Sequence, residues 1–362
     1  MRIFQTFVLP DHLVARHGLS FAAANFSRNL INGGVFDKTF SLIPTSVKGP
    51  LGEFDEDGYE VVYSRWRSRW KLLSLLAIFA EQWKIFSRVG PNDSIWFYNL
   101  NFLNAYLFLL LKIFKPSVRL NIIILDFTPA QSFREPNYWF LKLINRAHGV
   151  ISLSTSELFK VKNAALLPGV VPSSSSTLSE APQIQRPILT FLLSGVISET
   201  IALTSRVLEA FAQNPQCILH ITGKLSGNEE KIREYASRYP NIFYHGAIPF
   251  ADYLELLHTV TFQLSTRDPQ MPENQCNFPS KIIEALLHNR IVVSTIDYPQ
   301  LKGINHIYFD ADKMADALQR ISSMPLADLM ACANQSSEVR SRFSTDVWRD
   351  TMSRIEENEI QR

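Results

Sequence analysis

The chain alternates from end to end between short apolar, β-branched segments and longer amphipathic segments. This alternation is typical of parallel β-sheets covered by helices. It is interrupted by a Ser- and Pro-rich stretch at 172–187, a composition typical of linkers, and then starts again. A length of 362 residues also exceeds what one hydrophobic core usually organises. The sequence therefore predicts an α/β protein with one domain at 1–172, a second at 188–342, and a final helix within 343–362.

The first domain is expected to contain five strands and four helices. The predicted strands are Ile3–Leu9, Val61–Tyr63, Ser94–Tyr98, Leu120–Leu125 and Gly149–Ser152. The predicted helices are Ser20–Leu30, Arg69–Phe86, Asn101–Phe114 and Asn137–Asn145. The single Gly18 after the first strand is far short of a Gly-x-Gly-x-x-Gly dinucleotide signature, which argues against an NAD-dependent oxidoreductase.

The second domain repeats the same rhythm. Its predicted strands are Ile188–Leu193, Ile218–Thr222, Ile242–His245, Val260–Leu264 and Ile291–Val293. Its predicted helices are Thr204–Gln213, Glu229–Arg238, Tyr253–His258 and a short helix after Lys281, and the chain is expected to close with a helix at Phe343–Glu359.

Charge is spread unevenly over a chain whose net charge is only +2. Residues 1–183 hold 19 Lys and Arg against 13 Asp and Glu, a net of +6, and the remainder holds 17 against 21, a net of −4. A basic first half suits an anionic partner such as a membrane surface, although ordinary scatter would produce the same imbalance. No nucleic-acid recognition motif accompanies the basic residues, so nucleic acid is not expected as a partner.

The cysteine residues and the hydropathy of the chain indicate the cellular compartment in which the protein is expected. Cys217, Cys276 and Cys332 are widely spaced and form no metal-ligand pattern, which suggests a reducing compartment. The first ten residues lack the long apolar region and cleavage site of a signal peptide. The longest apolar stretches, Leu72–Ala80 and Phe102–Phe114, are shorter than the roughly 20 residues that span a bilayer. We therefore expect a cytoplasmic location, with the inner face of the membrane left open.

The clearest site signal lies between residues 267 and 297. A polar loop ends in Phe-Pro-Ser280-Lys281, and a short helix follows with Glu284 one turn in. Ser280 would lie where free N–H groups and the helix dipole attract anions, Lys281 adds a positive charge, and Glu284 can accept hydrogen bonds from sugar hydroxyls. A capped surface helix uses the same residue types. Arg267 upstream and the buried strand downstream favour a nucleotide-diphosphate sugar site.

The same stretch resembles the C-terminal domain of GT-B glycosyltransferases, especially family 4-type enzymes of surface-polysaccharide assembly with a Phe-Pro-Ser-Lys motif. The resemblance implies two Rossmann-like domains facing a central cleft, with the last helix crossing back to the first domain. It also implies that Ser280 and Lys281 contact the diphosphate, that Glu284 contacts the ribose, and that anomeric configuration is retained. Neither a metal nor a cofactor other than the sugar donor is implied.

Three features depart from that family pattern. Cys276 stands where many members carry a second Glu, and the strand entry is His-Asn-Arg290 instead of Gly-x-Pro. No Lys or Arg follows Gly195 until Arg206, although the family usually has basic residues there to grip phosphate. These departures keep open a second hypothesis, a GT-B-shaped protein without catalysis that serves as a scaffold in polysaccharide assembly.

Further donor-site candidates follow predicted strands of the second domain. Gly195 ends the first of these strands, and Gly223-Lys224 ends the next. Residues at the carboxyl ends of parallel strands face the crevice where ligands bind, so Lys224 could neutralise phosphate charge or be a solvated loop lysine. Arg267 also ends a strand. Its guanidinium suits a bidentate phosphate contact, although a salt bridge with Asp268 or Glu273 would explain it equally well.

In the first domain, Asp126 is the best polar candidate. A carboxylate there could orient or deprotonate an acceptor hydroxyl, or simply cap the turn at Thr128-Pro129. The expected catalytic set is therefore Asp126, Lys224 and Lys281. His12 and His17 lie on the loop after the first strand and are weaker candidates.

Two charged stretches complete the expectations. Asp55-Glu56-Asp57 resembles a metal-binding Asp-x-Asp, but in a Gly-flanked polar loop it is interpreted as solvated charge, and no metal is predicted. Arg65–Lys71 interleaves Trp with Arg, which suits a membrane interface or the basic leading edge of a core helix. The sequence thus predicts a glycosyltransferase that moves a sugar from a nucleotide-diphosphate sugar to a glycan or lipid-linked acceptor in cell-surface polysaccharide synthesis.

Overall fold

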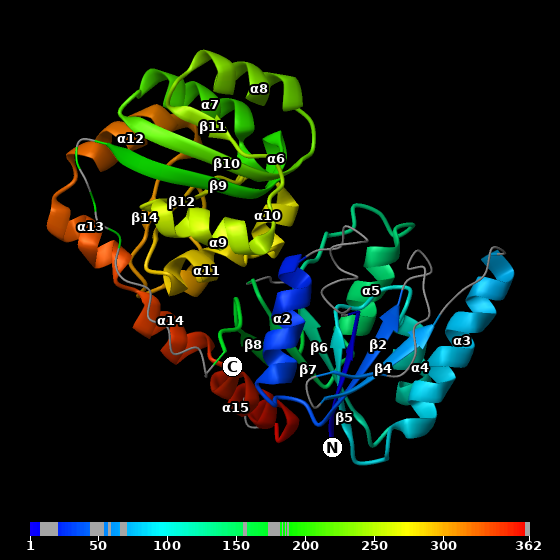
Figure 1. The fold of residues 1–362 in the computed structure, drawn as a ribbon. Helices are drawn as coiled ribbons and strands as arrows, with labels where there is room; N and C mark the ends of the chain where they lie inside the picture. The colour runs from blue at the N-terminus through cyan, green and yellow to red at the C-terminus, as the bar shows by residue number, and fades with distance from the viewer. Residues whose placement is uncertain are drawn as a thin grey trace. The chain divides into compact units, whose positions relative to one another are not determined.

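The computed structural model describes residues 1–7, 21–43, 54–56, 59–65, 71–154, 158–172, 182, 184, 186 and 188–358. It divides into two α/β units (Figure 1). Unit 1 comprises residues 1–174 and 343–362, and unit 2 comprises residues 175–342. His12, His17, Gly18 and most of the stretches Arg65–Lys71 and 172–187 lie outside the described residues.

Unit 1 is built on an eight-stranded sheet in the order β3-β4-β2-β1-β5-β6-β7-β8. The strands are β1 (Arg2–Thr6), β2 (Lys38–Ile43), β3 (Phe54–Glu56), β4 (Tyr59–Arg65), β5 (Ser94–Tyr98), β6 (Arg119–Ile124), β7 (Gly149–Ser152) and β8 (Asn163–Leu166). Its helices are α2 (Phe21–Asn32), α3 (Lys71–Arg88), α4 (Ala105–Phe114), α5 (Pro136–Ile144) and α15 (Thr345–Glu356). Every neighbouring pair is parallel except β3–β4.

The last helix, α15, packs onto unit 1. Gly149 of β7 lies so close to it that an added Cβ would overlap the Ile355 side chain. Glu356 forms an ion pair with Arg2 at 2.8 Å and accepts a hydrogen bond from the Trp96 indole at 2.8 Å. Burial alone would raise the pKa of Glu356, but these partners and the Ser94 hydroxyl lower it. The first strand and the last helix are therefore held together by a charged, hydrogen-bonded contact.

Unit 2 is built on a six-stranded parallel sheet in the order β11-β10-β9-β12-β13-β14. The strands are β9 (Leu189–Ile197), β10 (Cys217–Leu225), β11 (Ile242–Tyr244), β12 (Phe262–Ser265), β13 (Ile291–Ser294) and β14 (Ile307–Tyr308). The helices are α6 (Glu199–Ala202), α7 (Thr204–Gln213), α8 (Glu229–Arg238), α9 (Phe250–Thr259), α10 (Pro272–Cys276), α11 (Lys281–Leu287), α12 (Met314–Ser323), α13 (Leu326–Ala333) and α14 (Ser336–Phe343).

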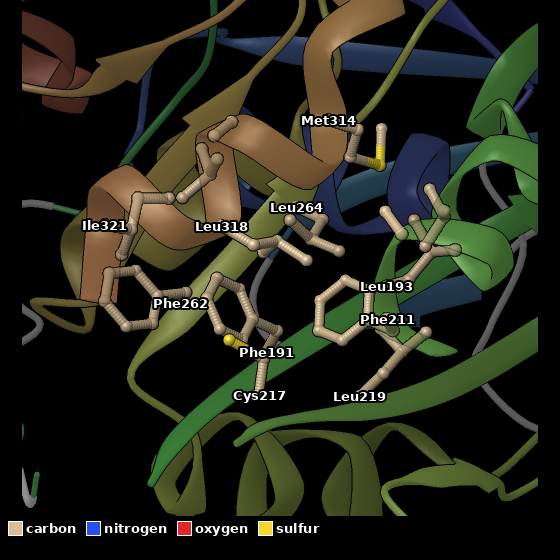
Figure 2. Packing of buried hydrophobic residues seen from close by; sticks show 14 of the residues in the cluster. Phe191, Leu193, Phe211, Cys217, Leu219, Phe262, Leu264, Met314, Leu318 and Ile321 are labelled. Atoms are coloured by element: carbon tan, nitrogen blue, oxygen red, sulfur yellow. The ribbon is translucent and has the colours of Figure 1, made fainter. Parts of the chain in front are cut away.

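The apolar side chains of β9 point alternately to the two faces of this sheet, which explains why helices cover both faces. Phe191 and Leu193 point into the main core with Phe211 of α7, and Phe191 stacks on Phe262 with ring centroids 4.5 Å apart (Figure 2). Leu192, between them, belongs to a separate cluster with Leu257 of α9. Because successive side chains of a strand point to opposite faces, one apolar run serves both layers.

The structure confirms the predicted fold class, and several elements begin and end at the predicted residues, among them β5, β7, α7 and α8. The short strands β2, β3, β8 and β14 were not predicted. One expectation is wrong: residues 54–56 are not loop but the antiparallel partner of β4, with Glu56 opposite Tyr59. Asp and Glu are disfavoured in strands, so Asp55 and Glu56 give no local strand signal, and the pairing depends on β4 lying alongside. No helix within the described ranges has the length and apolar character needed to cross a bilayer.

Candidate functional site

Two glycines face each other on neighbouring strands of unit 2. Gly195 of β9 pairs with Gly223 of β10, at φ values of +104° and +137°. A Cβ added to Gly223 would overlap the Gly195 carbonyl oxygen and lie 2.8 Å from the carbonyl carbon. The sequence predicts that Gly195 and Gly223-Lys224 end their strands, but the strands continue to Ile197 and Leu225. Because glycine tolerates positive φ, pairing continues through a distortion that would end most strands.

Lys281 reaches this glycine pair from the start of α11. Its ammonium donates a hydrogen bond to the Ser194 carbonyl oxygen. Its Nζ also lies 3.5 Å from the place where a Cβ of Gly195 would be. The structure thus brings together Gly195, Gly223 and Lys281 from two strands and a helix, and their role in donor binding stays a prediction.

Arg267 supplies a second cation close to Lys281. It donates hydrogen bonds from Nη1 to the Asn277 carbonyl at 3.3 Å and to Asn274 Oδ1 at 3.5 Å. Its Nε is buried and has no hydrogen-bond partner among the described residues. The suggested salt bridge with Asp268 or Glu273 does not form, and Asp268 Oδ1 instead accepts the Gln270 N–H at 2.9 Å.

The two cations affect each other's ionisation. Burial, together with the positive charge of Arg267, lowers the pKa of Lys281 to about 7. Neither side chain is ion-paired with a carboxylate in the part of the chain that the structure describes. Two neighbouring, partly desolvated cations without a counter-ion repel each other, so an anion bound between them would be stabilised by both.

Glu284 is held by a residue that sequence reasoning missed. Tyr253 of α9 donates its phenolic hydrogen to Glu284 Oε2 at 2.8 Å, across 31 residues of chain. Burial raises the pKa of Glu284, and the Tyr253 hydrogen bond opposes that rise. The other carboxylate oxygen, Oε1, accepts no hydrogen bond from any residue described here. No local pattern marks Tyr253, because its role depends on how α9 packs beside α11.

Removing the Tyr253 hydroxyl is therefore expected to raise the pKa of Glu284 further. In Tyr253→Phe the carboxylate loses the donor that favours its charged form, and the free energy of unfolding should fall by about 1 kcal/mol. NMR titration of labelled glutamate carboxyls would measure the pKa, and denaturant unfolding the stability. Tyr308→Phe, which changes a half-exposed ring in the same unit, is the control and should alter neither quantity. An unchanged Glu284 pKa in Tyr253→Phe would refute this role.

Ser280 occupies the N-cap position of α11, but its exposed side chain makes no capping hydrogen bond. The expectation that free N–H groups gather there is only partly met, because Ile282 already donates its N–H to the Pro279 carbonyl at 3.0 Å. Cys276, at the position where many of the resembling glycosyltransferases carry a second Glu, is buried. Asn274, two residues earlier, instead holds Arg267 and donates to the Thr200 carbonyl at 3.0 Å.

No described contact joins Lys224 to this cluster, and Asp126 belongs to unit 1. Lys224 follows Gly223 on β10, opposite Val196, and its side chain is exposed. Asp126 follows β6 in unit 1 and is exposed at its position after the strand. Burial, and secondarily the charge of Asp126, raises the pKa of Tyr98. The described residues include no group of three or more His, Cys, Asp or Glu placed to hold a metal ion.

No protein-family model and no curated protein sequence matches this chain. Solved structures do resemble it over nearly the whole length of both chains. The trehalose-6-phosphate synthase OtsA is 10% identical with a TM-score of 0.72 and complete coverage of both chains. The UDP-forming trehalose-phosphate synthase of Burkholderia xenovorans, in complex with glucose-6-phosphate, is 12% identical with a TM-score of 0.68, covering 99% of this chain and 100% of its own.

The sucrose-phosphate synthase of Thermosynechococcus elongatus is 14% identical with a TM-score of 0.69, and the match covers 99% of each chain. At these identities the likeness shows the fold alone. The expected membership of family 4 therefore stays a prediction. What the comparisons establish is the fold class, two α/β units of the GT-B type.

Proposed function

We propose that this protein is a glycosyltransferase and that unit 2 binds its nucleotide-diphosphate sugar donor. The observation that carries the proposal is the pair of neighbouring cations, Lys281, which lies beside Gly195, and Arg267, neither of which has a carboxylate partner among the described residues. A diphosphate is the anion that such a pair would accept most readily, because its charge is spread over two phosphoryl groups.

Each neighbouring group has a role in this proposal. The absence of a side chain at Gly195 leaves room for a phosphate to approach the backbone beside Lys281, whereas Gly223 packs against the Gly195 carbonyl. Glu284 would accept a ribose hydroxyl on Oε1 while Tyr253 fixes the carboxylate through Oε2. The exposed Ser280 hydroxyl can donate to a phosphate oxygen, and Lys224 remains a candidate for the same charge.

The proposed chemistry follows from where charge develops. As the bond between the anomeric carbon and the diphosphate oxygen breaks, negative charge accumulates on the departing diphosphate. Lys281 and Arg267 would stabilise that charge more strongly in the transition state than in the bound donor, which is the condition for rate acceleration. Asp126 is proposed as the group that orients or deprotonates the acceptor hydroxyl.

Two classes of acceptor are proposed, a sugar phosphate and a glycan or lipid-linked sugar. The structures with this fold include synthases of trehalose phosphate and sucrose phosphate, one of them in complex with glucose-6-phosphate, which supports a sugar phosphate. The Phe278–Lys281 motif supports instead a glycan or lipid-linked acceptor in polysaccharide synthesis. Transfer assays with UDP- and GDP-sugars should be run against hexose 6-phosphates and lipid-linked oligosaccharides in parallel. A radiolabelled product with either acceptor class supports the proposal, and failure to bind any nucleotide sugar rejects it.

A second candidate, a non-catalytic GT-B scaffold, is favoured by one specific observation. The stretch that follows Gly195 carries no Lys or Arg before Arg206, and Arg206 forms an exposed ion pair with Asp312. This protein would then bind nucleotide sugar through Lys281 but neither transfer nor hydrolyse it. Tight binding with no turnover against both acceptor classes would select the scaffold.

Donor binding is expected to weaken as pH rises. Lys281 has a pKa of about 7 in the free protein, and a bound diphosphate would raise it, so binding takes up a proton above that pH. Affinity should be greatest below the free pKa and fall by up to about tenfold per pH unit above it. Calorimetry with UDP-glucose between about pH 6 and pH 9, in buffers of different ionisation enthalpy, measures both effects.

The choice of ligand and control matters for that titration. UDP-glucose is preferable to UDP, whose terminal phosphate itself titrates near pH 6. In Lys281→Met the residual affinity should no longer depend on pH in this range. A wild-type affinity that stays constant across the range, with no proton uptake, would contradict the role given to Lys281.

A further inference from the structure

Helices α3 and α4 of unit 1 present large apolar side chains to solvent. The exposed set, called the aromatic face here, consists of Leu76, Phe79 and Trp83 from α3 and Leu109, Ile113 and Phe114 from α4. Their exposed fractions run from 38% at Leu109 to 66% at Ile113. Isolated exposed apolar residues are ordinary, but six large ones on two adjacent helices mark a surface that contacts something apolar.

The side chains of the aromatic face are spaced along the solvent-facing sides of two helices that contact each other. Leu76, Phe79 and Trp83 follow one another at helical spacing on α3, and Leu109 and Ile113 do so on α4. The two helices pack side by side (Figure 1), and the Phe79 ring meets Tyr106 with centroids 4.3 Å apart. The core is served by other residues of the same helices, including Ile85, Leu107 and Leu111.

Basic side chains lie on the same two helices. The exposed Lys and Arg among the described side chains of α3 and α4 are Lys84, Arg88 and Lys112, and Lys112 donates a hydrogen bond to the Arg146 carbonyl at 3.2 Å. The carboxylate described on these helices, Glu81, is half-buried and forms an ion pair with Lys84 at 3.0 Å. Lys115, which follows α4, holds its ammonium group over the ring of Phe86 of α3, at 4.3 Å from the centroid. Aromatic rings mixed with ammonium groups are characteristic of side chains at a bilayer interface.

We infer that the aromatic face docks this protein on a bilayer that contains anionic lipid. The apolar side chains would enter the headgroup and acyl boundary, and the surrounding cations would meet lipid phosphates. A second copy of the chain fits less well, because a two-fold contact would bring the same basic residues face to face. The inference does not depend on the donor site, which lies in unit 2. The proposed membrane contact lies on α3 and α4, after the Arg65–Lys71 stretch whose interleaved Trp and Arg also suit a membrane interface.

Sedimentation of the intact protein with vesicles tests this inference. Vesicles of phosphatidylcholine mixed with phosphatidylglycerol should bind the protein, whereas phosphatidylcholine alone should bind it at least about tenfold more weakly. Binding should also fall as salt is raised. The double substitution Trp83→Ser with Phe114→Ser should lower the affinity for anionic vesicles by at least about tenfold. Leu326→Ser removes an equally exposed side chain on α13 of unit 2 and should change nothing.

The oligomeric state of the protein tests the competing explanation, that the aromatic face mediates self-association. Light scattering of the same samples should show a monomer whose mass the double substitution leaves unchanged. A dimer that the double substitution converts to monomer would assign the aromatic face to self-association and overturn the inference. So would equal binding to both kinds of vesicle, or no binding to either. Circular dichroism and a thermal midpoint close to wild type would establish that the substituted protein is folded.

Discussion

Replacing Lys281 with methionine is expected to weaken UDP-glucose binding by about 30- to 150-fold, or about 2 to 3 kcal/mol. Methionine keeps most of the aliphatic stem and removes the ammonium that would contact the diphosphate. Hydrogen bonds between charged partners in a partly desolvated site are the strong ones, which is why a large effect is expected. Titration calorimetry at a pH below 7, where Lys281 of the free protein is mostly charged, measures the loss directly.

Folding should survive this substitution. The wild-type ammonium is desolvated and repelled by Arg267, so its removal takes away an unfavourable interaction along with the hydrogen bond to Ser194. Lys231→Met is the matched control, because Lys231 makes a surface ion pair with Glu209 in the same unit. It should leave UDP-glucose affinity within about twofold of wild type. If Lys281→Met binds as tightly as that control, the diphosphate does not lie at Lys281.

Replacing Gly223 with alanine is expected to destabilise the β9–β10 pair by about 3 to 5 kcal/mol. About 1 to 2 kcal/mol comes from placing a side chain at φ +137°, and the rest from overlap between the new Cβ and the Gly195 carbonyl. The overlap is with backbone on a paired strand, so it cannot be relieved by turning a side chain. Hydrogen exchange of peptides from β9 and β10 reports the local free energy of opening.

Gly227 offers a control that separates the two contributions. It also has a positive φ, +87°, but an added Cβ would meet nothing within 4 Å. Gly227→Ala should therefore show only the backbone penalty, about 1 to 2 kcal/mol. If Gly223→Ala and Gly227→Ala destabilise the protein equally, Gly223 is not packed against Gly195. Donor affinity should fall in Gly223→Ala and stay near wild type in Gly227→Ala.

The parts of the site that were predictable from sequence are those encoded locally. Lys281 and Glu284 are three residues apart on one helix, so their chemistry and spacing can be seen in the chain itself. The buried strand β13 was predicted from its β-branched residues, and the structure places it at Ile291–Ser294. Strand alternation and helix periodicity fixed the fold class for the same reason, since both are short-range patterns.

The parts that were not predictable depend on contacts between distant segments. Gly195 pairs with Gly223 because of the register between β9 and β10, and the residues next to each glycine in the sequence do not reveal that register. Tyr253 reaches Glu284 only because α9 packs beside α11, and Asn274 holds Arg267 only because α10 contacts α6. The aromatic face on α3 and α4 could be recognised only once the buried sides of those helices were known.

A crystal structure of the protein with UDP-glucose bound would test the donor site most directly. Diphosphate oxygens should lie about 2.7 to 2.9 Å from Lys281 Nζ and from a guanidinium nitrogen of Arg267, over the glycine pair. A ribose hydroxyl should contact Glu284 Oε1. A nucleotide bound elsewhere, with Lys281 still bonded only to Ser194 and Arg267 still without an anionic partner, would contradict the account.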